Sequence, residues 1–259
     1  MGEIAELHRL AGRAAAAIFD GPAAEVRITP GGALALTGEP VADLNMLVLA
    51  SPPSPAAERL LADAAALIDA QGLPLVALAP PDTGAALAPA AARLGLAAAG
   101  TMPLMVLRGP PRSQPVCACE IKDAVGTEGL RIATELAAAA FQLPADSLRR
   151  AWAASFGDTS GARTYVAYVD ATTPASSVTV TRTGGTAGIW CMSTPPERQG
   201  RGFGRALLTG VIDELRSQDV RRFYLFATAA GRPLYETLGF ETLADDVVWV
   251  RGHSTQTSP

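Results

Sequence analysis

Hydrophobic and polar positions in the second half of the chain alternate between short runs with a period of two and one longer run with a helical period. That longer run predicts an amphipathic helix beginning near Gly202. Its apolar face consists of Leu207, Leu208, Val211, Ile212 and Leu215. The shorter runs predict strands, and the expected order is strand 117–122, helices 127–141 and 147–156, strands 164–169, 178–181 and 186–192, the helix from 202, strand 222–228, helix 233–238 and strand 247–250.

The first half of the chain repeats part of this order. A strand at 44–50 leads through the proline-rich loop 51–55 into a helix, and a second strand follows at 75–78. A short helix and a strand at 104–107 complete this half. Two local strings also recur: Ser-Pro-Pro at 51–53 matches Thr-Pro-Pro at 194–196, and Leu-Gly recurs at 94–95 and 238–239. We therefore expect an internal duplication.

A break in composition separates the two halves. Residues 109–115 read Gly-Pro-Pro-Arg-Ser-Gln-Pro, and three prolines among polar residues cannot continue a helix or a central strand. The break predicts a first domain at 1–112 and a second at 116–252, and residues 253–259 are expected to form a frayed tail. Strands and helices alternate in both halves, so the predicted fold class is α/β (α+β), with a mixed central sheet flanked by helices.

Composition narrows the setting of the protein. A net charge of -4 gives no basic field for nucleic acid, so we expect no nucleic-acid partner. Charged residues interrupt the apolar positions of the first 20 residues, unlike a secretory signal, and no apolar run is long enough to span a membrane. We therefore expect a cytoplasmic protein with no membrane partner, with its three cysteines reduced. His8 and His253, near the two ends, are expected to be solvated.

A glycine-rich loop lies between the strand at 186–192 and the amphipathic helix. Gly200, Gly202 and Gly204 allow the backbone to turn tightly and its N–H groups to point into one concavity. The helix start adds a positive dipole end, and Arg201 and Arg205 can add charge. The loop has neither the Gly-Lys-Ser/Thr of a Walker motif nor the spacing of a dinucleotide fingerprint. It predicts a phosphate or pyrophosphate site, and the alternative is a plain connection from strand to helix.

Two strings in this half carry a family resemblance. The loop resembles the Gln/Arg-x-x-Gly-x-Gly/Ala motif of the GNAT superfamily of acyl-CoA N-acyltransferases, with Gln199, Gly202 and Gly204 at its defined positions. Leu-Tyr-Glu-Thr-Leu-Gly-Phe at 234–240 is similar to the family's Leu-Tyr-x-x-x-Gly-Phe segment. The resemblance implies a complete GNAT-like domain here. It also implies a degenerate GNAT-like first half without a CoA loop, because the loop at 51–55 has no glycine and its prolines lack amide donors.

The resemblance also implies a reaction. Acetyl-CoA or another acyl-CoA would be the co-substrate, and a primary amine of a small molecule or protein would be the acceptor. Tyr235 would be the general acid that protonates the leaving thiolate, and a strand N–H near Cys191 or Met192 would stabilise the oxyanion. The residues implied to bind CoA are Met192, Ser193, Thr194, Gln199, Gly200, Arg201, Gly202, Phe203, Gly204 and Arg205.

The general base has no counterpart in the sequence. Neither the strand region 186–194 nor the strand 222–228 contains a carboxylate, so a bound water could deprotonate the amine or the amine could arrive neutral. This gap keeps open an alternative function, a non-catalytic acyl-CoA-binding sensor. No metal site is expected, because Cys117 and Cys119 have no cluster of further ligands. The residues expected to contact the acceptor are Asn45, Trp190 and Thr228.

Overall fold

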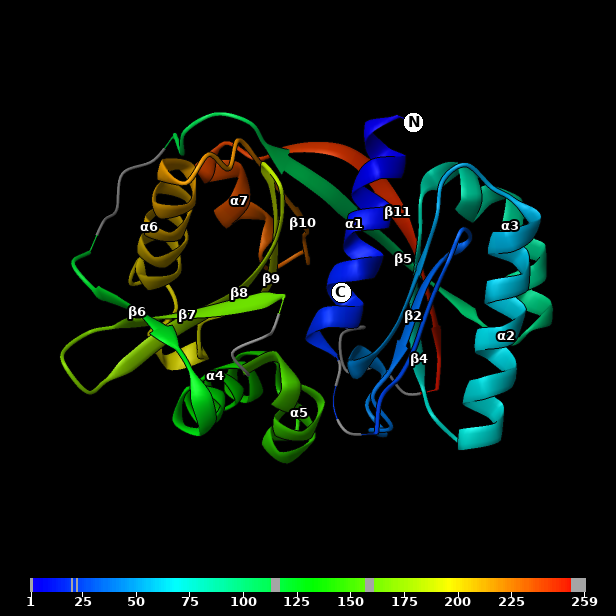
Figure 1. The fold of residues 1–259 in the computed structure, drawn as a ribbon, viewed down its shortest axis with the longest axis horizontal. Coiled ribbons are helices and arrows are strands. Elements are labelled where there is room, and N and C mark those ends of the chain that lie inside the picture. The colour runs from blue at the N-terminus through cyan, green and yellow to red at the C-terminus, as the bar shows by residue number, and fades with distance from the viewer. Residues whose placement is uncertain (1, 20, 22, 113–116, 157–160, 253–259) are drawn as a thin grey trace. The chain divides into compact units, whose positions relative to one another are not determined.

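The structure, a computed structural model, describes residues 2–19, 21, 23–112, 117–156 and 161–252 (Figure 1). The chain packs as two units, one formed by Met1–Leu104 with Leu243–Pro259 and the other by Met105–Thr242. Residues 113–115 of the predicted break, His253 and the predicted tail at 253–259 lie outside the described part. The division by packing differs from the predicted limits mainly in the last strand, which groups with the first unit.

The first unit is a mixed sheet with helices on both faces, as predicted for the fold class. Its strand order is β1-β2-β3-β4-β11-β5; β3 and β4 are parallel, whereas β1/β2, β2/β3 and β4/β11 are antiparallel. In Figure 1, α2 and α3 cover one face and α1 the other. The elements are α1 (Glu3–Ile18), β1 (Glu25–Thr29), β2 (Gly32–Leu36), η1 (Ala42–Leu44), β3 (Asn45–Leu49), α2 (Pro55–Gln71), β4 (Leu75–Ala79), α3 (Pro81–Arg93), β5 (Ala97–Leu107) and β11 (Glu241–Arg251).

The start of α2 corresponds in the expected duplication to the start of the helix after the glycine-rich loop. Here the Ser54 side chain accepts a hydrogen bond from the Ala57 N–H and caps the helix. The turn between β1 and β2 lies against the same helix start, and a Cβ atom on Gly31 would come within 2.3 Å of the Ala56 carbonyl oxygen. The Ala57 N–H is therefore already bonded, and the turn between β1 and β2 packs against the first turn of α2.

The expectation that His8 is solvated is wrong. Its side chain is fully buried in α1, where the ring Nδ1 donates to the Ile4 carbonyl at 2.8 Å. The ring Nε2 lies 2.5 Å from Oδ2 of Asp246, which is equally buried, on β11. Sequence reasoning missed the pair because 238 residues separate its members. The contact ties the first helix of this unit to its last strand.

Asp246→Ala is expected to lower the free energy of unfolding by about 3–5 kcal/mol, because it removes the buried carboxylate that bonds to Nε2 of the His8 ring. Denaturant unfolding would measure the change, provided that the free energy of unfolding depends on denaturant concentration with the same slope in both proteins. The matched control is Asp146→Ala, which removes the exposed partner of Arg149 and should cost well under about 1 kcal/mol. If the two substitutions lowered the free energy of unfolding equally, the buried pair would contribute no more to stability than the exposed pair.

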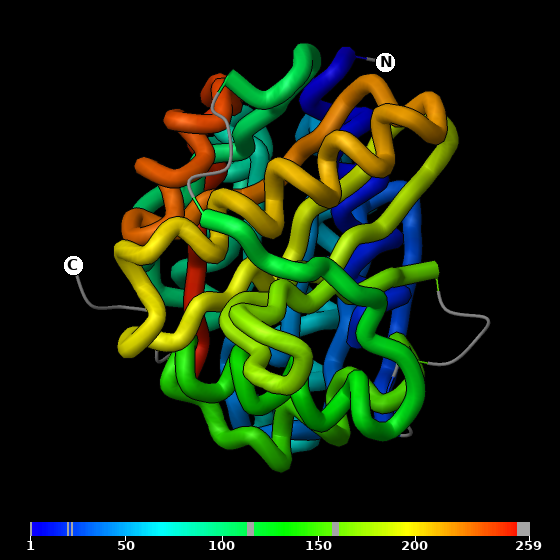
Figure 2. The backbone as a smooth tube through the Cα atoms, turned by 90° about the vertical axis from the view of Figure 1, so that its left-hand side faces the viewer, coloured from blue at the N-terminus to red at the C-terminus, as the bar shows by residue number. Residues whose placement is uncertain are grey.

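The second unit is also a mixed sheet between helices. Its strand order is β10-β9-β8-β7-β6, antiparallel except for the β9/β10 pair, and the end of β5 contributes Met105 and Leu107 to its core. Figure 2 shows α6 in gold above the strands and α4 and α5 in green below them. The elements are β6 (Glu120–Ala124), α4 (Gly126–Phe141), α5 (Ala145–Ala151), η2 (Ala153–Phe156), β7 (Ala162–Tyr168), β8 (Pro174–Thr183), β9 (Thr186–Ser193), η3 (Pro196–Arg198), α6 (Phe203–Ser217), β10 (Arg222–Phe226) and α7 (Arg232–Leu238).

The hydrophobic face of α6 forms the core of this unit as its period predicted. Leu207, Leu208 and Val211 are completely buried against inward-facing residues of the strands. The predicted helix at 147–156 is instead the short α5 followed by the 3₁₀ turn η2. None of the helices in the described part of the chain has the length and apolar character that a bilayer crossing needs.

Candidate active site

The glycine-rich loop joins β9 to α6 through the single turn η3. Gly200 and Gly202 adopt φ values of 71° and 85°, in the left-handed region that residues with a Cβ atom avoid. Gly204 meets a different constraint, because a Cβ atom there would lie 3.1 Å from both Met192 Cε and Thr194 Oγ1. The first two glycines therefore allow the turn, and the third allows α6 to pack closely against the end of β9.

The loop leaves a row of backbone donors exposed to a ligand. Ala206 is the first residue of α6 whose N–H bonds backward, to the Gly202 carbonyl at 2.9 Å. Within the described part of the chain, the N–H groups of residues 200–205 have no hydrogen-bond acceptor. Such a row at the positive end of a helix dipole is suited to a pyrophosphate.

Two arginines flank these donors. Arg201 is exposed, and its guanidinium lies over the Phe203 ring at 5.1 Å. Arg205 is half-buried, and its Nε is a buried donor with no acceptor among the described residues. A buried donor without an acceptor is costly, and an anion held by the loop would satisfy it. The residues of the loop therefore fit a bound phosphate or pyrophosphate.

The strands beside the loop part from each other. β9 and β10 pair in parallel from Thr186↔Arg222 to Gly188↔Tyr224, and among the described residues β9 has no further pair on that side as it continues to Ser193. On its other side, the register with β8 shifts, so that Cys191 and Met192 together face Val178. Cys191 has a φ of 50°, which is rare for a residue other than glycine. This bulge redirects backbone groups of β9 at the point where β10 has left the ladder.

Tyr235 comes to this place from α7. Its side chain is buried, its ring packs edge-on against Phe240 at 5.8 Å, and a Cβ atom on Gly231 would lie 3.1 Å from the ring. Burial, with a smaller contribution from Cys191, raises the pKa of the Tyr235 phenol above its ordinary value. Burial alone raises the pKa of the Cys191 thiol to about 12. Both groups thus lie in surroundings that disfavour an anion.

Trp190 and Thr228 have defined structural contacts. Trp190 donates from Nε1 to Thr181 Oγ1 at 3.0 Å, and its ring packs against Tyr224 and Phe226. Gly188 makes this packing possible, because a Cβ atom there would lie 2.6 Å from Trp190 Nε1. The Thr228 hydroxyl accepts the Gly231 N–H at 3.1 Å, at the start of α7.

Asn45 lies in the first unit with its side chain fully buried. Its carbonyl accepts from the Thr37 N–H at 2.9 Å, and its amide donates to the carbonyls of Glu39 and Val41 at 2.8 and 3.1 Å. This set uses both of its N–H donors and fixes the turn before β3. The expected contact between Asn45 and an acceptor is therefore wrong, because an enclosed and fully bonded amide has nothing to offer a ligand.

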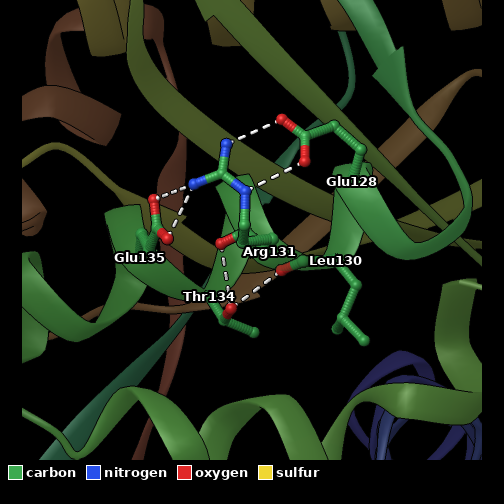
Figure 3. Close-up of polar contacts among 5 residues, drawn as sticks. All are labelled: Glu128, Leu130, Arg131, Thr134 and Glu135. Atoms are coloured by element: carbon green, nitrogen blue, oxygen red, sulfur yellow. Dashed lines mark hydrogen bonds and ion pairs between the residues drawn. The ribbon is translucent and has the colours of Figure 1, made fainter.

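Helix α4 carries carboxylates, but they are engaged with an arginine (Figure 3). Arg131 donates to Glu128 at 2.7 and 2.9 Å and to both oxygens of Glu135 at 2.7 Å. The hydrogen bond from Arg131 is the main cause that lowers the pKa of Glu128. Both carboxylates are largely exposed. Groups so exposed and so paired are poor bases for a buried reaction.

The structure adds residues that the sequence motifs did not single out. Ser176 on β8 is fully buried, and its hydroxyl contacts the end of β9. A serine in a strand carries no motif, so only the tertiary contact reveals it. Among the described residues, no three His, Cys, Asp or Glu side chains gather as metal ligands would.

Solved structures share the fold of the chain. The GCN5-related N-acetyltransferase from Kribbella flavida has a TM-score of 0.70 at 17% identity, over 98% of this chain and 97% of that one. A tandem GNAT protein from the clavulanic acid biosynthesis pathway has a TM-score of 0.59 at 19% identity, over 94% and 88%. The GCN5-related N-acetyltransferase from Sphaerobacter thermophilus has a TM-score of 0.57 at 18% identity, over 78% and 70%. At these identities the likeness shows a common fold.

Sequence comparison gives a family for the second unit. No curated protein sequence matches the chain. The model of the acetyltransferase (GNAT) family matches residues 128–240, which run from α4 through the glycine-rich loop to the end of α7. Residues 128–240 of this chain therefore match the acetyltransferase (GNAT) family, the family that the loop and the Leu-Tyr-x-x-x-Gly-Phe string predicted.

Proposed function

We propose that the second unit transfers an acyl group, most simply acetyl, from acyl-CoA to a primary amine of a small molecule or protein. One observation carries the proposal: the open row of N–H donors at residues 200–205 lies beside the point where β9 leaves β10. Gly204 joins the two features, because it packs on Met192 and Thr194 at the end of β9. A phosphate on the loop would place the rest of an extended ligand along that strand.

The pyrophosphate, the pantetheine arm and the thioester of acyl-CoA each have a partner in this proposal. The loop amides and Arg205 hold the pyrophosphate, with Arg201 adding charge from the surface. The pantetheine arm adds along the free edge of β9 at Met192, Ser193 and Thr194. The thioester carbonyl lies at the bulge, where a redirected N–H can stabilise an oxyanion.

The reaction needs one bond made and one bond broken. The neutral amine attacks the thioester carbon, the carbon–sulfur bond breaks, and the products are an amide and the thiol of CoA. The surroundings that raise the pKa of Cys191 to about 12 would also disfavour a CoA thiolate beside it. The thiolate therefore needs a proton as it leaves, and the Tyr235 phenol, which burial keeps protonated, supplies it. The amine then loses a proton to water, and the Tyr235 phenolate takes a proton back from water, so the net reaction neither releases nor consumes a proton.

We assign no side chain as the general base. The strands at the site carry no carboxylate, and Glu128 and Glu135 on α4 are bound to Arg131. The amine either arrives neutral or loses its proton to a water held by backbone carbonyls. Thr228 and Trp190 remain proposed neighbours of the acceptor, through the surfaces that their structural contacts leave open.

The pH dependence of the rate follows from the direction in which burial shifts the pKa of Tyr235. The ordinary phenol pKa is about 10, and the pKa of Tyr235 is raised, so the acid stays protonated at every pH below about 10. The rate should rise as the amine acceptor loses its proton and then stay level to about pH 10. A pH profile of kcat measures this. An alkaline decline centred well below pH 10 that is absent in Tyr235→Phe would show that Tyr235 titrates in that range, and it would contradict the raised phenol pKa on which this expectation rests.

The activity itself is tested by measuring thiol release from acetyl-CoA with a panel of primary amines, together with calorimetric titration of CoA. Binding and amine-dependent release are expected. Tight binding of CoA without release on any amine would instead favour an acyl-CoA sensor. Absence of binding would remove the assignment of the loop.

A further inference from the structure

A chain of hydrogen bonds links the bulge in β9 to the glycine-rich loop. The Ser193 hydroxyl donates to the Cys191 carbonyl at 2.8 Å, and the Ser176 hydroxyl donates to the Ser193 carbonyl at 2.7 Å. Ser176 Oγ also lies 2.8 Å from Thr194 Oγ1. The chain ends at Gln199, whose Nε2 donates to the Thr194 carbonyl at 3.0 Å. Side chains thus connect the proposed thioester position with the first residue of the proposed pyrophosphate loop.

The direction of these bonds is fixed by the number of protons. Ser176 has a single hydroxyl proton, which goes to the Ser193 carbonyl. The Thr194 hydroxyl must therefore donate to Ser176 Oγ. This orients the Thr194 side chain beside Gly204, at the start of α6, where a Cβ atom would lie 3.1 Å from Thr194 Oγ1. The buried Ser176 therefore holds the end of β9 and orients the Thr194 side chain that lies beside the start of α6.

The second serine holds the conformation of the bulge. Cys191 has a left-handed φ of 50°, which is unfavourable for a residue with a Cβ atom. The Ser193 side chain is fully enclosed and binds the Cys191 carbonyl across the bulge. Because the Ser193 side of this hydrogen bond is enclosed, water competes with it less than with a bond at the surface. Loss of the hydroxyl would let the bulge relax and its N–H groups turn away from the thioester.

We infer that Ser176 and Ser193 are positioning residues of the acyl-CoA site, an inference that rests on the proposed function. Ser193 fixes the bulge that faces the thioester, and Ser176 fixes the end of β9 against the loop. Neither residue needs to touch the reacting atoms. Their effects should differ, because one acts at the reacting carbonyl and the other on the alignment of the whole CoA ligand.

Two substitutions separate these roles. Ser193→Ala should lower kcat about tenfold and leave the Kd for CoA nearly unchanged, because the loop stays in place. Ser176→Ala should weaken CoA binding about tenfold, because the end of β9 is freed from Thr194 and the loop. Ser176→Thr keeps the hydroxyl and should restore most of the affinity. General destabilisation would not produce this split between kcat and Kd.

Ser177→Ala is the matched control. Ser177 is the next residue on β8, is buried, and has its backbone opposite Ser193, and its hydroxyl makes no hydrogen bond within the described part of the chain. Calorimetric CoA titration, steady-state kinetics and thermal unfolding would be measured for all variants. The inference would be overturned if Ser176→Ala and Ser193→Ala had the same CoA affinity and the same kcat as Ser177→Ala.

The outcomes distinguish this inference from the function on which it rests. If the wild-type protein neither binds CoA nor releases thiol, the proposed function fails first. If the wild type is active and the serine variants match the control, only the inference fails. If Ser176→Ala does not fold, Ser176→Cys keeps the size of the side chain and weakens both of its hydrogen bonds. A CoA Kd unchanged by Ser176→Cys would then overturn the inference, and a raised Kd would support it.

Discussion

Gly202→Val is expected to weaken CoA binding about 100-fold or more. A change of this size corresponds to the loss of at least two charge-assisted hydrogen bonds. Gly202 has a φ of 85° at the N-cap of α6, and a β-branched residue cannot hold that conformation without strain. A change to negative φ would turn the N–H groups of Phe203 and Gly204 away from their common direction. Calorimetric titration with CoA would measure the loss.

Gly72→Val provides the matched control for that experiment. Gly72 ends α2 in the first unit with a φ of 66°, and a Cβ atom there would meet nothing within 4 Å. The same substitution at a similar backbone angle should lower stability without changing the Kd for CoA. Retained affinity in Gly202→Val, or equal losses in both variants, would show that the loop does not bind CoA.

Tyr235→Phe is expected to lower kcat about 100-fold or more while the Kd for CoA stays within about twofold. The substitution removes only the hydroxyl, which has no hydrogen-bond partner among the described residues, and leaves the ring packed on Phe240. The protein should therefore keep its stability. Single-turnover measurements with saturating acetyl-CoA and amine would isolate the chemical step.

Tyr165→Phe is the control for the loss of a buried phenol. Tyr165 lies on β7 in the same hydrophobic core, and its hydroxyl is 3.4 Å from Glu214 on α6, away from the parting of β9 and β10. This variant should keep its kcat. Unchanged turnover in Tyr235→Phe would remove Tyr235 from the role of general acid and leave water as the proton donor.

Several features of the second unit could be predicted because their signals are local. The apolar positions of α6 repeat with the helical period, and the helix buries that face as expected. The glycines at 200 and 202 take the left-handed angles that such spacing favours. The limits of the strands were less accurate: β11 begins at Glu241 rather than at 247, and β5 begins at Ala97 rather than at 104. The exposed residues that start these strands lack the apolar pattern on which the predictions relied.

Other features depended on contacts between distant residues. The hairpin of β1 and β2 has only a weak strand pattern in the sequence. In the structure, β2 pairs with β3, and the turn of the hairpin packs against the first residues of α2. His8 carried no motif, and only β11, folded back beside β4, brings Asp246 to it. Ser176 similarly has a role only because β8 lies beside the bulge of β9. No pattern along the chain encodes such pairings, because they arise when strands far apart in sequence become neighbours.

The sequence alone determined that a glycine-rich loop precedes an amphipathic helix, and it predicted that this loop binds phosphate and that Tyr235 takes the place of the general acid of the GNAT family. These signals are local because they depend on backbone angles and helical period. The tertiary structure decided how the end of β9 is shaped, which hydroxyls hold it, and that Asn45 is enclosed rather than available to a ligand. Those properties depend on burial and on hydrogen bonds between strands, which exist only after the chain has packed.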